Sequence, residues 1–486
     1  MLSKFILLIA FAKGVLSPQI HYSCLNTDEC KSAFTSKYYC NFQLTCEHLP
    51  ISYSAMEVVG LVIVTLLVTI TNTGGVGAGT VIVPTLMVFL KFIVTDAIPH
   101  ARITVMCGSL ITFVMVGLAR SRSDKSKFET SYNLAATMSP LLLAGSQIGV
   151  MLSGWLPSTI TGAILGSYLL ISLVQTFRRA VKEIGREKRL DKPTSEYKPF
   201  ATQISSNNIV PATTLEDESD LLAIPKRYNN QAPDKPKISK LQLELDTSNK
   251  TQKSKKKMII ENVHNFMMII LAMCVIVIST LLRGGRGVES MIGIKGCSLS
   301  SWLVLCASQI ILAVISYISY RTNATVFTPE DVGISPHSRI PREHHHKIRF
   351  QLILASYVVG ILAGLLGIGG GLVIGLYMMT MGLSMQSTTA FSNFIVLISS
   401  IATTLQFAVL GDIQLHNSYQ FVVIALVGSF LGNYVFRPLL RKINKTSVVV
   451  WLVFGVLCIA TVVLPAEIVK RTIENPKGAI TFGQFC

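Results

Sequence analysis

The sequence has few charged residues for its length. Lys, Arg, Asp and Glu make up 14% of its 486 residues, whereas soluble domains carry about 25%. Half of the residues are hydrophobic, and the mean hydropathy is +0.53. Apolar runs of about 17–25 residues, long enough to cross a bilayer as helices, recur along the chain. Because backbone groups in lipid must pair within their own segment, these runs predict a polytopic membrane protein built from helices.

The apolar runs also lack the groups that catalysis and proton relays need. No Asp or Glu lies near the middle of a predicted span, and no nucleophile–base pair or cluster of metal ligands occurs within one. This argues against an integral enzyme and against a relay of buried carboxylates. Glu57, Arg102 and His264 lie near predicted span ends, where extension to the interface explains them best. The alternative for Arg102 is that it attracts an anion. The sequence indicates no cofactor.

The interleaved aromatic and basic residues of a nucleic-acid surface are missing too. The formal net charge of +17 is instead typical of a positive bias in cytoplasmic loops. When crossings are counted from an extracytoplasmic N-terminal segment, every strongly basic loop reaches the cytoplasmic side: 120–133, 178–257, 321–349 and 437–446. We therefore expect membrane lipids, and no nucleic acid, among the partners.

Cysteine pairs with the CxxC spacing of zinc sites are absent from the N-terminal region, although cysteines are dense there. The first 17 residues combine a lysine, a short apolar core and small residues, which is typical of a signal peptide. Four cysteines follow: Cys24, Cys30, Cys40 and Cys46. This pattern predicts disulfides in an oxidising compartment, with zinc binding as the alternative.

The apolar runs and polar loops divide the chain into eight segments. We predict a signal peptide (1–17), a Cys-rich extracytoplasmic segment (18–54), a first transmembrane repeat (55–177) and a disordered basic cytoplasmic loop (178–257). Two connecting helices (258–320), a cytoplasmic loop (321–349), a second transmembrane repeat (350–464) and a tail (465–486) follow. The predicted fold class is all-α, with about twelve transmembrane helices. Two of them, 80–93 and 371–383, are short enough to be half-helices or tilted segments rather than full crossings. The two five-helix repeats have opposite orientations, as in many secondary transporters.

Glycine is concentrated in two similar stretches, one in each repeat. Residues 74–84 read GGVGAGTVIVP, and residues 365–375 read LLGIGGGLVIG. Glycine inside a helix costs about 1 kcal/mol relative to alanine, so both stretches predict a helix break. The residues concerned are Gly75, Gly77, Gly79, Thr80 and Pro84 in the first, and Gly367, Gly369, Gly370 and Gly371 in the second.

A broken helix offers an anion site. The helix that restarts after each break, near Gly79 and near Gly371, presents unpaired N–H groups and the positive end of its dipole. Irregular backbone at membrane depth also has to line a cavity or be covered by protein. The alternative for each stretch is close helix packing through small residues. Because matching breaks occur in both repeats, we favour a site for a small anionic substrate.

The span that follows the second break carries many neutral polar residues. It reads QSTTAFSNFIVLISSIATTLQF, and Thr388, Thr389, Ser392 and Asn393 recur at helical spacing near its start. Hydroxyl and amide groups can bind an oxyanion without fixing a full charge in lipid. Each residue alone could instead bond back to a helix carbonyl or mediate packing. The four are candidate substrate-binding residues because they lie closest to the break.

These residues resemble the TauE/SafE family of sulfite and organosulfur anion exporters. The resemblance rests on GGVGAGTVIVP, on LAGLLGIGGGLVIG with the polar span after it, and on RGGRGVESMIGIKGCSLSSW at 283–302, which looks like the segment that joins the halves in eukaryotic members. It covers about 55–464. It implies a membrane transporter of sulfite or a similar small anion.

The sequence therefore predicts a multi-pass secondary transporter that exports sulfite or a related sulfur-containing anion by alternating access. One alternative is a transporter or channel for another anion. Another is a scaffold or receptor that uses the Cys-rich segment and the long loop to bind partners. Substrate, direction, coupling ion, oligomeric state and the choice between plasma membrane and endomembrane stay open.

Overall fold

The computed structural model describes a set of ranges that covers most of the predicted spans. These are 24–33, 35–40, 46–74, 78–117, 132–190, 263–284, 290, 292–294, 298–323, 342–380, 385–413, 415–439 and 447–474. The predicted signal peptide, most of the loop at 178–257 and the last residues of the tail lie outside them. The chain divides into two units, and the helices discussed below belong to the unit made of 1–183 and 261–486.

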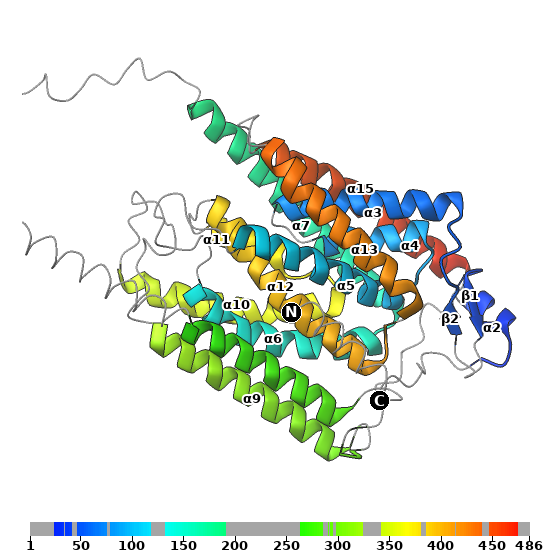
Figure 1. Ribbon diagram of the computed structural model, residues 1–486, viewed down its shortest axis with the longest axis horizontal. Coiled ribbons are helices and arrows are strands. Elements are labelled where there is room, and N and C mark those ends of the chain that lie inside the picture. Colours follow the sequence, from blue (N-terminus) through cyan, green and yellow to red (C-terminus); the bar gives the residue numbers. More distant parts are fainter. Residues whose placement is uncertain are drawn as a thin grey trace, which may run out of the picture. The chain divides into compact units, whose positions relative to one another are not determined.

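The described residues are mostly helical (Figure 1). The long helices are α3 (Ala55–Gly74), α5 (Val94–Thr112), α6 (Tyr132–Trp155), α7 (Ser158–Leu190), Val263–Arg283, α9 (Leu299–Thr322), α10 (Arg342–Leu366), α12 (Met385–Leu410), α13 (Leu415–Leu431) and α15 (Ser447–Glu474). Short π-helices, η1 (Phe113–Gly117) and η4 (Gly432–Phe436), extend α5 and α13. Nine helices in the described ranges are long and apolar enough to cross a membrane.

Two of the twelve predicted spans are half-length helices. These are α4 (Gly79–Phe89), with 11 residues, and α11 (Gly371–Thr380), with 10. A helix rises about 1.5 Å per residue, so each reaches about 16 Å, roughly half of a bilayer core of about 30 Å. The sequence expectation that these two segments are half-helices is confirmed, and the count of twelve full crossings is not.

The N-terminal module departs from the all-α prediction. It consists of α2 (Thr27–Ala33) and the strands β1 (Tyr38–Cys40) and β2 (Cys46–His48), which pair antiparallel. Disulfides join Cys24 to Cys40 and Cys30 to Cys46, so the prediction of disulfides rather than zinc is confirmed. Small segments of this size need such covalent links because they bury too little apolar surface.

The N-terminal module and the segment after it contact the ends of several membrane helices (Figure 1). Three contacts identify the starts of helices: Lys37 Nζ lies 2.9 Å from Glu57 Oε1 of α3, the Tyr38 hydroxyl donates to Asp96 Oδ2 of α5 at 2.7 Å, and the Ile51 amide donates to Asn417 Oδ1 of α13 at 3.3 Å. At the end of α4, His48 Nε2 lies 2.9 Å from the Leu90 oxygen. Arg471, near the end of α15, donates to the Phe92 oxygen at 3.0 Å. These five helix ends therefore lie at one side of the bundle, which we call the module side.

Helices α6 and α10 pack with their backbones in contact. A Cβ atom on Gly145 would meet the carbonyl oxygen of Tyr357, and one on Gly149 would meet that of Ile361. From the first contact to the second, the position advances by four residues on both helices, so α6 and α10 run parallel. Gly360 and Gly364 of α10 approach the backbone of α6 in the same way. Small residues at this spacing permit the close helix packing that is common in membranes.

Buried apolar side chains form two clusters. The first is built mainly from α3, α4, α5, α7 and α15 and includes Ala78 and Ile368 at the helix breaks, and the second is built mainly from α6, α10, α12 and Val263–Arg283. Many large apolar side chains on the outside of these helices are exposed, as expected for surfaces in contact with lipid acyl chains; examples are Ile310 and Val462.

Candidate functional site

The restarted helices begin where the sequence predicts. Helix α4 begins at Gly79 and α11 begins at Gly371. Gly75 and Gly77 lie outside the described residues, so their predicted role stays a prediction. Helix α4 ends at the module side, where its last turn packs on Gly60 near the start of α3. Its first residue therefore lies about 16 Å below the module side, near mid-depth of the membrane.

The two breaks touch each other. A Cβ atom on Gly79 would meet the carbonyl oxygen of Gly367 and would lie 3.0 Å from Cα of Ile368. Only glycine allows the start of α4 to approach the backbone of the second break this closely. Two segments that are far apart in the sequence thus meet where both helices are interrupted.

The second break depends on glycine for its conformation as well. Gly367, Gly369 and Gly370 have φ values of 73°, 76° and 69°, in the left-handed region. Residues with a Cβ atom adopt this region at a cost of about 1–2 kcal/mol each. The turn then leads into α11, whose first turn includes a bond from the Ile374 amide to the Gly370 oxygen at 3.2 Å.

Helices α5 and α12 pack around the second break. Ile98 of α5 contacts Gly367, while Val105 of α5 and Val396 of α12 both contact Gly369. The Ser399 hydroxyl donates to the Gly369 oxygen at 3.2 Å. The two helices also touch directly, where the hydroxyl oxygens of Ser109 and Ser400 lie 3.5 Å apart. Four elements, α4, α5, α11 and α12, therefore converge at the breaks.

The polar face of α12 contains the four predicted residues, and all four are buried. Gly375 of α11 faces two of them, because a Cβ atom there would lie 2.8 Å from the Ser392 hydroxyl and 3.9 Å from a Thr388 methyl group. Among the residues that the structure describes, Thr388 Oγ1, Ser392 Oγ and Asn393 Nδ2 have no hydrogen-bond partner. Thr389 does have an interaction partner.

Other hydroxyls on α12 follow the packing interpretation instead. Ser400 donates to the Leu397 oxygen at 3.0 Å, and Thr403 donates to the Ser399 oxygen at 2.8 Å. Helix back-bonding of this kind satisfies a hydroxyl without any ligand. Thr404 Oγ1 and Gln406 Nε2, further along α12, also have no partner among the described residues, so the contrast separates the back-bonded hydroxyls from five polar side chains of this helix.

Two further predicted residues belong to α4. Thr80 follows the contact glycine and is fully buried, and its Oγ1 has no partner among the described residues. Pro84 is buried one turn further on. Because the first turn of a helix has unpaired N–H groups anyway, Thr80 adds a hydroxyl to a helix end that already favours an anion.

The interface interpretation of Arg102 is wrong, whereas Glu57 lies in the first turn of α3, at the span end that the sequence predicts. Arg102 is 0% exposed, and Nε, Nη1 and Nη2 have no hydrogen-bond partner within the described part of the chain. Glu57 is 2% exposed and pairs with Lys37. His264 is exposed, as expected. The predicted span began at 99, but α5 begins at Val94, so Arg102 lies two turns inside the helix.

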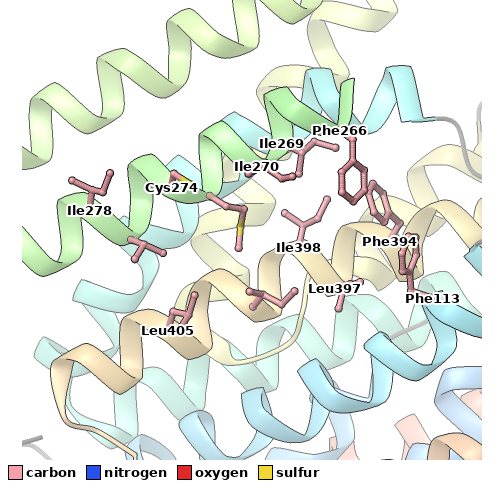
Figure 2. A pocket seen from close by; sticks show the side chains of 13 residues that line it. Phe113, Phe266, Ile269, Ile270, Cys274, Ile278, Phe394, Leu397, Ile398 and Leu405 are labelled. Carbon is pink, nitrogen blue, oxygen red and sulfur yellow. The ribbon is translucent and has the colours of Figure 1, made fainter. Parts of the chain in front are cut away.

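The opposite face of α12 borders an apolar cavity of about 410 Å³ (Figure 2). Phe394, Ile398 and Leu405 line it from α12, and Phe266 and Cys274 line it from helix Val263–Arg283. Apart from the thiol, these side chains offer nothing that could bind an anion. The cavity is therefore separate from the candidate site.

The helix breaks and their surroundings define a class of protein. It is a multi-pass membrane protein with two interrupted helices that meet at mid-depth beside buried, unpaired polar groups. Discontinuous helices of this kind form the substrate sites of many secondary transporters.

Comparison with known proteins gives the family. The model of the sulfite exporter TauE/SafE family matches residues 60–209 and 263–464. The chain belongs to this family of membrane transporters.

Curated relatives have the same family name. Sulfite exporter TauE/SafE family protein 5 of Arabidopsis thaliana is 23% identical over 81% of this chain and 79% of its own length. Family protein 2 of the same plant is 22% identical over the same shares of the two chains. No solved structure gives a significant match.

Proposed function

We propose that the protein is a secondary transporter that exports sulfite or a related small sulfur-containing anion by alternating access. The observation that carries the proposal is the contact between Gly79 and Gly367, which brings two helix breaks together beside buried polar groups. The family model and the names of the Arabidopsis relatives support an exported sulfur oxyanion.

Helix directions support an inverted repeat. Helices α3, α5 and α13 begin at the module side. Helix α12 ends just before α13 begins, so α5 and α12 run in opposite directions. Helix α7 begins beside the end of α15, because a Cβ atom on Gly162 would lie 2.5 Å from Ile468. Helix α6 therefore ends at the module side, and α10, which is parallel to α6, runs opposite to α3.

The two half-helices also run in opposite directions. Helix α4 runs toward the module side. Helix α11 ends just before α12 begins at the opposite side of the bundle, so α11 runs away from the module side. An inverted pair of repeats with one broken helix each can expose one central site to the two sides in turn. The halves packed against each other through α4, α5, α11 and α12 are the parts that would rock.

The site can bind an anion through three kinds of group. The first turns of α4 and α11 supply unpaired N–H groups and the positive ends of two helix dipoles. Thr80, Thr388 and Ser392 supply hydroxyls, and Asn393 supplies an amide. Glycines at the breaks keep the backbone accessible to the anion: Gly79, Gly367, Gly369, Gly370 and Gly371. We propose the same role for Gly75 and Gly77. Pro84 fixes the backbone conformation in the second turn of α4.

Transport by purified protein tests this function. The full chain is reconstituted in liposomes, and uptake of radiolabelled sulfite is measured under imposed pH or voltage gradients, with unlabelled sulfite, sulfate and chloride as competitors. We expect saturable uptake that unlabelled sulfite inhibits, absent from protein-free vesicles. Vesicles that contain folded protein and show no saturable flux of sulfite or of simple sulfonates would contradict the proposal.

A further inference from the structure

Arg102 is a buried cation whose partner is missing from the described part of the chain. It is fully buried, and none of its three guanidinium nitrogens has a hydrogen bond or an ion pair there. The nearest acidic residue on its own helix, Asp96, accepts a hydrogen bond from Tyr38 at the module side. A guanidinium stays protonated in proteins, so the charge cannot be removed by loss of a proton.

A buried charge without a partner lowers stability strongly, and apolar residues of similar volume often stabilise a protein where they replace one. Such a residue therefore makes physical sense only if something else supplies the opposite charge. Buried unsatisfied groups of this kind are expected where a ligand binds. Ionisable residues within membrane spans mark substrate pathways for the same reason.

The position of Arg102 indicates which ligand this is. Ile98, four residues before it, contacts Gly367, and Val105, three residues after it, contacts Gly369. Residues at these spacings share one face of a helix. Arg102 thus lies on the face of α5 that packs against the second break, between the two contacts.

Thr80 also lies beside this break. It directly follows Gly79, which contacts Gly367 and Ile368. Its hydroxyl is buried and has no partner among the described residues. A cation and a neutral hydroxyl, both fully buried and both with unused hydrogen-bonding capacity, therefore lie on the two elements that enclose one helix break.

We propose that Arg102 is the charge partner of the transported anion. This proposal rests on the proposed transport function. It adds Arg102 to the substrate-binding residues and predicts a preference among anions. The planar guanidinium fork pairs with two oxygens of one ligand, which suits a sulfite or sulfonate group and does not suit a halide. Arg102 therefore favours oxyanions with two or more oxygens over chloride, and Thr80 donates to a further oxygen.

Equilibrium binding of radiolabelled sulfite to the purified full chain tests this proposal. Three variants are compared with the wild type: Arg102→Gln, Arg102→Lys, and Arg283→Gln as a control. Arg283 is a partly buried arginine that already has partners within the protein, the Ser301 hydroxyl and the Met151 sulfur. Release of the label by unlabelled sulfite separates binding from covalent reaction with the disulfides, in which sulfite bonds to one sulfur and the other leaves as a thiolate.

We expect Arg102→Gln to weaken sulfite binding at least a hundredfold and to leave the melting temperature of the ligand-free protein equal to or above that of the wild type. A purely structural arginine would instead lower that temperature. Arg102→Lys keeps the charge without the fork, so binding should weaken about tenfold and the preference for sulfite over chloride should fall. Arg283→Gln should bind like the wild type.

Sulfite affinity equal to the wild type in Arg102→Gln would overturn the proposal. If that variant does not fold, an unchanged affinity and unchanged preference over chloride in Arg102→Lys would overturn it. These outcomes differ from failure of the transport function, in which the wild type itself shows neither saturable binding nor flux. Wild-type flux with a fully active Arg102→Gln would leave transport standing and remove only the role of Arg102.

Discussion

Glu57 and Arg102 are both buried ionisable residues, but one lies at the module side and the other beside the helix breaks, and their surroundings are opposite. Glu57 pairs with Lys37 and accepts hydrogen bonds from the amides of Ser52 and Ser54 at 3.1 Å. Arg102 has no partner among the described residues. The cost of burying the charge of Glu57 is therefore offset by groups of the protein itself. No group among the described residues offsets the cost of burying Arg102.

This difference distinguishes structure from function in a single chain. At the module side the hydrogen bonds and ion pairs are made by the protein itself, so that region holds helix ends in place. At the breaks, the polar groups of α4, α5 and α12 have capacity left over. Buried groups of this kind are rare in folded proteins and need an explanation, which a bound anion provides.

The largest effect is expected where the two breaks touch. Gly79→Ala places a Cβ atom against the Gly367 oxygen, so α4 has to move away from the second break. We expect sulfite flux in liposomes to be abolished while the protein still reaches the membrane. Gly455→Ala in α15 is the matched control, because a Cβ atom there has open space around it. Normal flux in Gly79→Ala would show that the contact between the breaks is not needed.

At the polar face of α12, the expected effect is on substrate affinity. Ser392→Ala combined with Asn393→Ala removes two groups with unused hydrogen-bonding capacity, each worth about 1 kcal/mol to a ligand. The KM for sulfite should rise at least about tenfold, with little change in melting temperature. Thr403→Ala, which removes a hydroxyl bonded to its own helix, should leave KM unchanged. A double variant with a wild-type KM would assign Ser392 and Asn393 to packing.

At the module side, the expected effect is on stability. Glu57→Gln weakens an ion pair and several charged hydrogen bonds, and we expect a loss of about 2 kcal/mol, limited because Lys37 is partly exposed. The measurement is thermal unfolding in detergent, with KM for sulfite unchanged. Asp28→Asn, at a 94% exposed carboxylate, should have no measurable effect. A change in KM without a change in stability would contradict this division between the two regions.

The effect expected to be smallest at neutral pH concerns the titration of His48. Burial lowers the pKa of His48 to about 4, although its contacts with the Leu49 and Leu90 oxygens oppose the shift. The unfolded chain binds a proton near pH 6.5, and the folded one does so only near pH 4. Stability should therefore fall as the pH decreases through this window. His48→Gln should flatten that part of the pH profile of the melting temperature, and an unchanged profile would rule out His48 as its source.

Local features of the fold could be predicted from the sequence. The starts of α4 and α11 follow from glycine clusters in otherwise apolar runs, and the half-length of both helices follows from the short apolar run after each cluster. The four N-terminal cysteines indicate disulfides. Each of these depends on neighbouring residues only.

Long-range features could not be predicted. No local pattern relates Gly79 to Gly367, or decides which cysteines pair. The burial of Arg102 could not be predicted because of a boundary: the predicted span begins at 99, whereas α5 begins five residues earlier and includes Pro99. Helix starts are the least reliable part of a sequence prediction. A shift of five residues moves a side chain from the interface to the membrane interior.

Locating a bound anion would test the central claim most directly. Selenite is the selenium analogue of sulfite, and its anomalous scattering would locate it in crystals of the full chain. We predict one strong peak between the starts of α4 and α11, from a selenite whose oxygens lie within hydrogen-bond distance of the Arg102 guanidinium. Ordered selenite found elsewhere, with Arg102 buried and still unpaired in the same crystals, would contradict an anion site at the helix breaks.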